Sequence, residues 1–242
     1  MRIFAKTDKG KVRDINQDAF AANVLSGGAA FAVVCDGMGG ASAGDIASKT
    51  AVEIISQYVL NGYNQSMDSQ EIKRLLDNAI TSANIEVFTL SQKDESLNGM
   101  GTTVVCAIVS DTQAVICNVG DSRAYVVNDD LIQITRDHSV VQTLVESGKL
   151  SPEEARVHPE KNVITRALGV EENVLTDSYF IDIGKEDKIL LCTDGLSNYA
   201  DSDNILRIVN NNALDKITDL LIKQANSGGG RDNITAAIIS HR

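Results

Sequence analysis

The stretch Ala29-Ala-Phe-Ala-Val-Val-Cys-Asp-Gly37 is an uninterrupted apolar run that stops at an aspartate followed by glycine. The run has no polar face and is rich in small and β-branched residues, which is typical of a strand covered on both sides. The same design recurs at Lys188-Ile-Leu-Leu-Cys-Thr-Asp-Gly195. We therefore expect sheets with two buried faces and a carboxylate just beyond several strand ends.

Other short apolar runs predict further strands, and helical periodicity separates them into groups. Strands are expected at Ala19–Val24, Ala29–Cys35, Thr103–Val109, Ala114–Asn118, Ala124–Val127, Val174–Ile181, Lys188–Cys192 and Ile234–Ile239. Apolar residues at i, i+3, i+4 spacing predict one helix pair within 46–87 and a second within 205–221. Because strands and helices come in groups and do not alternate, we expect an α+β fold. Its predicted form is two stacked antiparallel β-sheets flanked by helix pairs, a four-layer α-β-β-α sandwich.

The length, charge and cysteine content of the chain exclude several classes of function. With 242 residues, the chain fits a single domain spanning 1–242. A formal net charge of −11 disfavours nucleic acids and anionic membrane surfaces, because both require a basic footprint. The four cysteines form no CxxC pair, no apolar run is as long as a membrane span, and the first residues lack a signal-peptide core. These features favour a cytoplasmic protein, with a monomer as the default.

Five aspartates flank the predicted strands: Asp18, Asp36, Asp121, Asp194 and Asp232. For any single one, a turn is the simpler interpretation, since Asp-Gly is a common turn dipeptide. If the strand ends meet at one edge of two packed sheets, the carboxylates would repel one another unless a cation neutralised them. Oxygen ligands without paired histidines or cysteines favour Mg²⁺ or Mn²⁺ over zinc. Two such ions side by side are a recurring device for hydrolysing phosphate esters.

Two other segments bear on function. Arg13 lies five residues before Asp18 and offers a guanidinium that could grip two phosphate oxygens, with a solvated surface charge as the alternative. The segment 145–164 contains both prolines of the chain, Pro152 and Pro159, and we expect it to be a surface flap with one short helix. The sequence has neither a GxxxxGK[ST] nucleotide-binding loop nor a GxSxG nucleophile motif.

Several motifs occur in a fixed order along most of the chain. The first two are Arg13-Asp-Ile-Asn-Gln-Asp18 and Asp36-Gly-Met-Gly-Gly40. The later ones are Gly101–Thr103, Asn118–Arg123, Asp137–Ser139, Arg166–Gly169, Thr193–Gly195 and Arg231–Thr235. Together they resemble the bacterial protein phosphatase 2C family, the metal-dependent serine/threonine phosphatases, whose opening motifs read RxxNQD and DGMGG. The segment 144–162 resembles the flap of the bacterial members. Each motif is short, but eight in the family order are specific.

The resemblance implies the same sandwich fold and a set of metal ligands. It implies that Asp36 bridges two Mn²⁺ or Mg²⁺ ions and that the Gly37 carbonyl binds one of them. Asp194 and Asp232 would complete the shell of the second ion. Asp121, together with Asp194, would hold a third and weaker ion.

The resemblance also implies a reaction. Asp18 would contact the metal cluster through water, and Arg13 would bind the substrate phosphate. The expected reaction is hydrolysis of phosphoserine and phosphothreonine in proteins by attack of a metal-bound hydroxide, without a phospho-enzyme. The expected partners are phosphorylated proteins, including a Ser/Thr protein kinase whose action the enzyme would oppose, together with that kinase's substrates.

One departure from the family pattern concerns the general acid. Many bacterial members carry His directly after DGMGG, where this chain has Ala41, and eukaryotic members carry one at the position of Met38. We expect a bound water to protonate the leaving group, with His138 as the alternative; otherwise His138 is expected to be buried and hydrogen-bonded. Two rival functions stay open at this point: a non-catalytic pseudophosphatase that binds phosphoproteins, and a metal-dependent hydrolase of nucleotides or other small phosphate esters.

Overall fold

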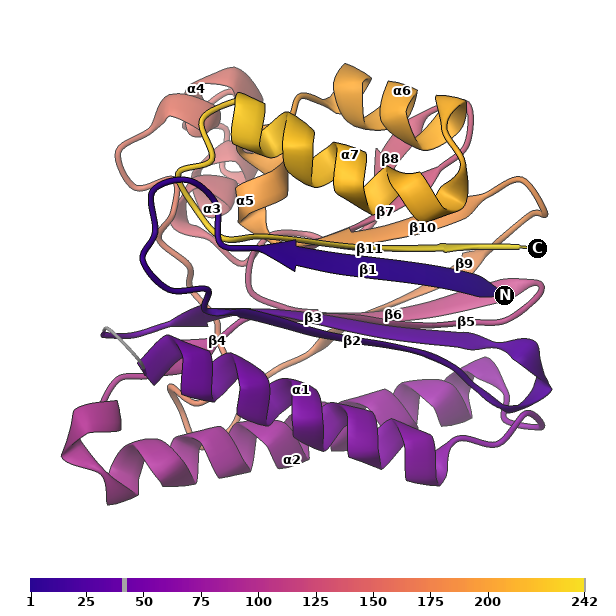
Figure 1. Cartoon of the computed structure of the whole chain (residues 1–242). Helices are drawn as coiled ribbons and strands as arrows, with labels where there is room; N and C mark the ends of the chain where they lie inside the picture. Colours follow the sequence, from indigo (N-terminus) through magenta and orange to yellow (C-terminus); the bar gives the residue numbers. More distant parts are fainter. Residues whose placement is uncertain (41–42, 242) are drawn as a thin grey trace.

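Within residues 1–40 and 43–241, which the computed structural model describes, two antiparallel β-sheets lie face to face with helices on both outer sides (Figure 1). The strand order of the first sheet is β1-β11-β10-β7-β8. The order of the second is β2-β3-β5-β6-β9, with β4 paired to β3. Helices α1 and α2 cover the second sheet, and α6 and α7 cover the first (Figure 1). The predicted four-layer α-β-β-α sandwich is confirmed.

The elements have the following bounds. The first sheet contains β1 (Arg2–Asp8), β7 (Arg123–Val127), β8 (Leu131–Gln133), β10 (Lys188–Cys192) and β11 (Ile234–Ser240). The second contains β2 (Asp18–Val24), β3 (Ala30–Met38), β4 (Gly101–Thr102), β5 (Val104–Val109), β6 (Gln113–Val119) and β9 (Asp177–Asp182). The α-helices are α1 (Ala43–Gly62), α2 (Ser69–Lys93), α3 (Val140–Glu146), α4 (Pro152–Val157), α5 (Asp194–Ser197), α6 (Ser202–Asn211) and α7 (Leu214–Ser227), and short 3-10 turns lie at η1 (Ser26–Gly28) and η2 (Glu95–Leu97).

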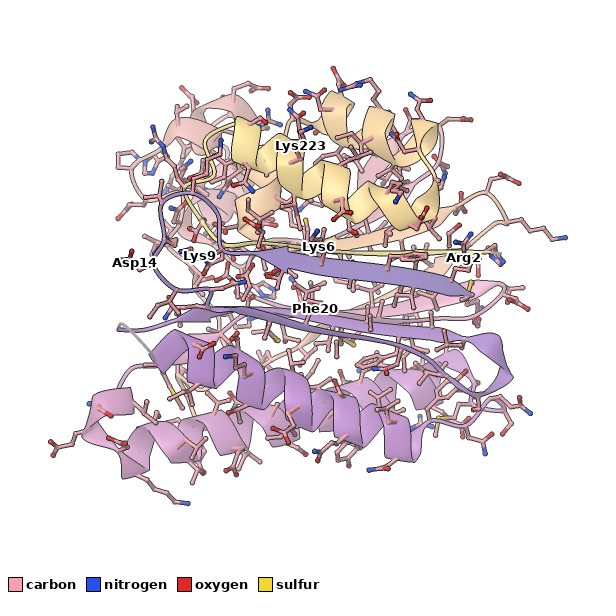
Figure 2. All side chains as sticks on the ribbon, in the orientation of Figure 1. Arg2, Lys6, Lys9, Asp14, Phe20 and Lys223 are labelled. Carbon is pink, nitrogen blue, oxygen red and sulfur yellow. The ribbon has the colours of Figure 1, made fainter. Side chains whose placement is uncertain are left out.

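Strand β3 has no polar face because both of its faces are covered. Ala32 and Val34 belong to the apolar cluster between the two sheets, where Phe20 of β2 also packs (Figure 2). Phe31 and Val33 point the other way, into the cluster formed with α1 and α2. Side chains alternate between the faces of a strand, so a continuous apolar run is required wherever a sheet lies between two layers.

The helices begin and pack as their sequences predict. Helix α2 starts at a capping box in which Asp68 Oδ1 accepts from the Glu71 amide at 2.8 Å and Glu71 Oε2 accepts from the Asp68 amide at 2.9 Å. Its buried residues recur at helical spacing from Ile72 to Val87. None of the described helices is long and apolar enough to cross a membrane. All four cysteines are buried and free.

Some elements differ from the prediction. Strands β1, β4 and β8 were not expected from the sequence, and β9 starts at Asp177, whereas the predicted strand began at Val174. Strand β1 is an edge strand paired only with β11, and its outward charged residues interrupt any apolar run. The short strands β4 and β8 are set by pairing with longer neighbours, which local sequence does not reveal.

The predicted flap segment 145–164 lies within a longer excursion of the chain. An antiparallel bridge joins Ser139 to Ile164, and the Val140 amide donates to Val163 O at 2.9 Å, so this excursion is closed at 139 and 164. It contains α3 as well as α4. Helix α4 is the short helix that was expected; it begins at a capping box between Ser151 and Glu154.

Candidate functional site

Strand ends from both sheets meet at one end of the sandwich. Asp18, the first residue of β2, pairs in register with Asp36 near the end of β3. Asp194 follows β10 and Asp232 precedes β11, so these two come from the other sheet. Lys9 and Asp14, on the loop that crosses from β1 to β2, lie at this same end (Figure 2). The predicted convergence of the acids on one edge is what the structure shows.

Asp18 is the most deeply buried of these acids, at 4% exposure. Its Oδ2 accepts hydrogen bonds from Thr235 Oγ1 at 2.6 Å and Thr193 Oγ1 at 2.9 Å, which tie β2 to the opposite sheet. Its Oδ1 is buried without a partner in the described structure. Burial raises the pKa of Asp18 to about 7 against the opposing effect of the two threonine hydrogen bonds, and the negative charges of Asp194 and Asp232 raise it further.

Asp36 is fixed mainly through its backbone. Its amide donates to Thr103 Oγ1 at 2.9 Å, and its carbonyl accepts from Thr102 Oγ1 at 2.9 Å. Burial raises the pKa of the Asp36 carboxyl well above its ordinary value, and the nearby charges of Asp18 and Asp194 add to the shift. The threonines at the β4–β5 junction therefore hold this carboxyl in an environment that disfavours its ionised form.

Asp194 and Asp121 extend the acidic cluster toward the flap. Burial raises the pKa of Asp194 to about 6, and the negative charge of Asp232 contributes to this increase. Asp194 Oδ2 accepts from Asn198 Nδ2 at 3.0 Å, and its Oδ1 is buried without a partner among the described residues. Burial raises the pKa of Asp121 to about 8, and the Asp194 charge contributes.

The donor set fits a hard divalent cation. The cluster supplies only oxygen atoms, and two of them, Asp18 Oδ1 and Asp194 Oδ1, are buried without a hydrogen-bond partner in the described part of the chain. Among those same residues, no three His, Cys, Asp or Glu side chains already form a group able to hold an ion. Asp232, for example, is engaged with Arg13 and with the Asn233 amide. Side-chain rotation would be needed to complete an ion's coordination shell.

Arg13 sits at the rim of the cluster. Its Nη2 is 2.8 Å from Asp232 Oδ2, and half of its side chain is exposed, at 51%. The hydrogen bond to Asp232 raises the pKa of Arg13, and burial opposes it. The guanidinium is therefore charged, anchored on one side and open to solvent on the other, which suits it to bind an anion.

Gly37 is a glycine because backbone segments approach it closely. Its amide donates to Gln17 O at 3.1 Å, and a Cβ at this position would lie 2.0 Å from Gly44 O. The family resemblance gives the Gly37 carbonyl a role as a metal ligand. The structure adds a packing reason, since any side chain would push α1 away from β3.

Asn233 has a positioning role that was not expected from the sequence. Its Nδ2 donates to Lys9 O and Ile15 O, both at 2.9 Å, and its Oδ1 accepts from the Gln17 amide at 2.8 Å. One side chain at the start of β11 thus fixes the loop that carries Arg13. The available signal was the position of Asn233 inside the Arg231–Thr235 motif.

His138 is engaged at both ring nitrogens. Nδ1 accepts from the Gly120 amide at 3.0 Å, so Nε2 carries the proton and faces Asp177 Oδ2 at 3.2 Å. Burial lowers its pKa, and the hydrogen bond with Asp177 opposes that effect. The prediction of a buried, hydrogen-bonded histidine is confirmed. Met38 offers no imidazole, and Ala41 lies outside the described residues.

Comparison with known proteins gives consistent matches over almost the whole chain. The family described as protein phosphatase 2C matches residues 9–236. The serine/threonine phosphatase stp of Listeria innocua is 39% identical over 238 residues, covering 97% of this chain and 93% of that protein. The crystal structure of the serine/threonine phosphatase Stp1 from Staphylococcus aureus superimposes with a TM-score of 0.93 at 35% identity, covering 99% of this chain and 94% of that one. A crystal structure of the catalytic domain of the phosphatase PstP in complex with 2 manganese ions gives a TM-score of 0.86 at 31% identity, covering 98% and 96%.

Proposed function

The chain belongs to the protein phosphatase 2C family and is a metal-dependent protein serine/threonine phosphatase, and on this basis we propose that Asp36, Asp194 and Asp232 hold two Mn²⁺ or Mg²⁺ ions. Asp36 would contribute to holding both ions, with the Gly37 carbonyl as a further ligand. Asp121 and Asp194 would hold a third, weaker ion. The clustering of buried acids with raised pKa values is the observation that carries this assignment, because a divalent cation removes the cost of ionising them together.

The buried oxygens without partners give independent support. Asp194 Oδ1 would be desolvated and unpaired unless a ligand satisfied it. Asp18 Oδ1 is in the same situation, and Asp18 is held rigidly by its two threonines. We assign Asp18 a contact to the metal cluster through water and a role in fixing the distance between the two sheets.

The chain's own groups then account for substrate binding. When bound, the ions supply an activated water and neutralise charge on the phosphoryl oxygens. Arg13 holds the substrate phosphate with the guanidinium N–H groups that do not bind Asp232. Asn233 keeps the Arg13 loop in place, so that the phosphate and the acidic cluster stay aligned. With both ring nitrogens of His138 engaged, we assign protonation of the leaving group to water.

Arg13→Ala is expected to raise KM for a phosphothreonine peptide about tenfold with a smaller change in kcat, because one charge-assisted contact to phosphate is lost. Steady-state kinetics at saturating Mn²⁺ measures the changes in KM and kcat separately. Lys9→Ala removes an equally positive, exposed side chain from the same loop and should leave KM unchanged. If Arg13 serves only to position Asp232, KM will stay constant at saturating metal and the apparent metal affinity will fall instead.

The metal requirement is tested by phosphate release from a phosphothreonine peptide. We expect release with Mn²⁺, loss of release with EDTA, and recovery when excess Mn²⁺ is restored. Activity that persists in EDTA would contradict the metal assignment. A lasting preference for nucleotides over phosphopeptides would instead favour a hydrolase of small phosphate esters.

The remaining assignments are also proposals. We take residues 1–242 as one phosphatase domain with a flap inserted between the bridge residues Ser139 and Ile164. The four free, buried thiols are consistent with a reducing cytoplasm. A monomer that acts on phosphoproteins and opposes a Ser/Thr protein kinase is the arrangement we propose. The acidic net charge of −11 disfavours nucleic acids or a membrane surface as partners.

A further inference from the structure

Two neighbouring cavities of about 340 Å³ each lie between the flap and the segment that follows β10. The first extends to Asp121 and Asp194 of the acidic cluster. The second extends along α5 and the start of α6 to Tyr199. Figure 1 shows α4 and α5 at the same end of the sandwich, where the strand ends converge. The two cavities together form a cleft that leads away from the proposed metal centre.

Four residues line both cavities, and all four are hydrogen-bond donors: Arg123, Arg156, Lys161 and Asn198. Three of them are cations, in a chain whose net charge is −11. They come from separate elements: β7, α4, the end of the flap and the turn after α5. Such a gathering of positive charge from distant parts of the sequence is unusual for a surface that is acidic overall.

Two of these cations have no anionic partner. The charge of Arg123 is paired with that of Asp137, because Arg123 Nε and Nη2 donate to the Asp137 carboxylate at 2.7 to 3.1 Å. In contrast, the side chains of Arg156 and Lys161 make neither a hydrogen bond nor an ion pair with any residue of 1–40 and 43–241. The positive charge of the cleft is therefore available to a ligand.

The carboxylates of the cleft do not cancel that charge. Asp137 is neutralised by Arg123. Asp201 caps α6, with its oxygens accepting from the Asn204 amide at 2.8 Å and from Asn204 Nδ2 at 2.6 Å, and its single negative charge offsets only one of the two free cations. Asp121 and Asp194 belong to the proposed metal centre, where bound cations would offset them. The free pair Arg156 and Lys161 thus gives the cleft a net positive potential beyond the metal centre.

Asn198 connects the cleft to the reaction site. Its Nδ2 donates to Asp194 Oδ2 at 3.0 Å, and the same residue lines both cavities. A substrate segment whose phosphorylated residue reaches the acidic cluster would pass its neighbouring residues along Asn198 toward Arg156 and Lys161. We propose that this cleft is a second anion site, which binds an acidic side chain, either a carboxylate or a second phosphate, next to the phosphoserine or phosphothreonine being hydrolysed. The inference rests on the proposed function and defines its substrate class as phosphoprotein segments with a second negative charge.

The test compares two sets of phosphothreonine peptides that differ only in one flanking residue, glutamate or glutamine, placed in turn at each neighbouring position. The quantity measured is the ratio of kcat/KM for the glutamate peptide to that for the matched glutamine peptide. At the best position the wild-type ratio is expected to be about two to five, the range that solvent-exposed ion pairs supply. The double variant Arg156→Gln/Lys161→Gln is expected to bring the ratio to about one.

Lys149→Gln provides the matched control, because it removes one exposed positive charge from the same flap outside either cavity. That variant should keep the wild-type ratio, which excludes a general effect of net charge. Raising the salt concentration should lower the wild-type ratio, since exposed charges are screened. A wild-type ratio of one at every position, or an unchanged ratio in the double variant, would overturn the second anion site while leaving the phosphatase assignment intact. Failure to hydrolyse any of the peptides with Mn²⁺ present would count against the proposed function itself, and the second site would fall with it.

Discussion

Asp36→Asn is expected to lower kcat/KM for a phosphothreonine peptide about a thousandfold or more, while the protein stays folded. The substitution keeps the size of the side chain but removes the charge proposed to bridge two ions. The backbone contacts of residue 36 with Thr102 and Thr103 do not depend on the side chain and should persist. Single-turnover kinetics with saturating Mn²⁺ and a calorimetric Mn²⁺ titration together measure the loss of rate and of metal binding.

The matched control for this variant is Asp14→Asn. Asp14 is exposed on the loop at the same end of the molecule, so it tests removal of one negative charge near the site without touching the cluster (Figure 2). Its activity should stay within about twofold of wild type, as expected for a screened surface charge. Wild-type activity in Asp36→Asn, with unchanged Mn²⁺ binding, would remove Asp36 from the metal centre.

The second large effect concerns stability in a chelator. In EDTA, the free energy of unfolding should fall by several kcal/mol as the pH rises from about 4 to about 8. Asp194, Asp18 and Asp121 have folded pKa values of about 6, 7 and 8, above the ordinary value of 3.8. A carboxyl whose pKa is raised by folding stabilises the fold fully below its unfolded pKa. That contribution is lost as the pH rises through the folded value.

Saturating Mn²⁺ should counter this trend. The ion binds deprotonated carboxylates of the folded chain, so it should stabilise the protein more at about pH 8 than at about pH 5. At a hundredfold excess of free Mn²⁺ over Kd, the free energy of unfolding should rise by about 3 kcal/mol relative to the protein in EDTA at the same pH. Urea unfolding at several pH values, with EDTA or Mn²⁺, gives both curves. Asp121→Asn should flatten the fall in EDTA, and Asp14→Asn should leave its slope unchanged. If the unfolding free energy in EDTA does not depend on pH, burial and mutual repulsion do not raise the pKa values of these acids in the folded protein.

The fold was largely predictable because its central strands are apolar on both faces. The run ending at Cys35 could only be a strand between two layers, and its grouping with similar runs implied stacked sheets. The elements that sequence analysis missed lack this signal. Strand β1 carries Arg2, Lys6 and Asp8 at an edge, and the two-residue strand β4 exists only through its pairing with β3. Their formation depends on partners that come from distant parts of the chain.

The aspartates of the candidate site could be predicted from the sequence, but the side chains that hold them in place could not. Asp36 and Asp194 follow apolar runs in the sequence, so their positions indicate a common edge. The hydroxyls of Thr193 and Thr235 that hold Asp18 gave no such signal, because a threonine in a strand or directly after one is common for reasons of β-propensity alone. The free cations Arg156 and Lys161 of the cleft were also hidden, since only folding brings them to one surface with Arg123 and Asn198.

The hydrogen bonds of Asn233 also affect when the chain can reach its active fold during synthesis. They join residues 216 to 224 positions apart, and the bonds between Asp18 and its threonines span 175 and 217 positions. Such distant partners make folding slow, because long loops must close before the contacts that stabilise them can form. During synthesis, the loop carrying Arg13 emerges long before the strand that will anchor it. We therefore expect that a growing chain on the ribosome does not hydrolyse phosphopeptides, and that activity appears only once β11 inserts beside β1.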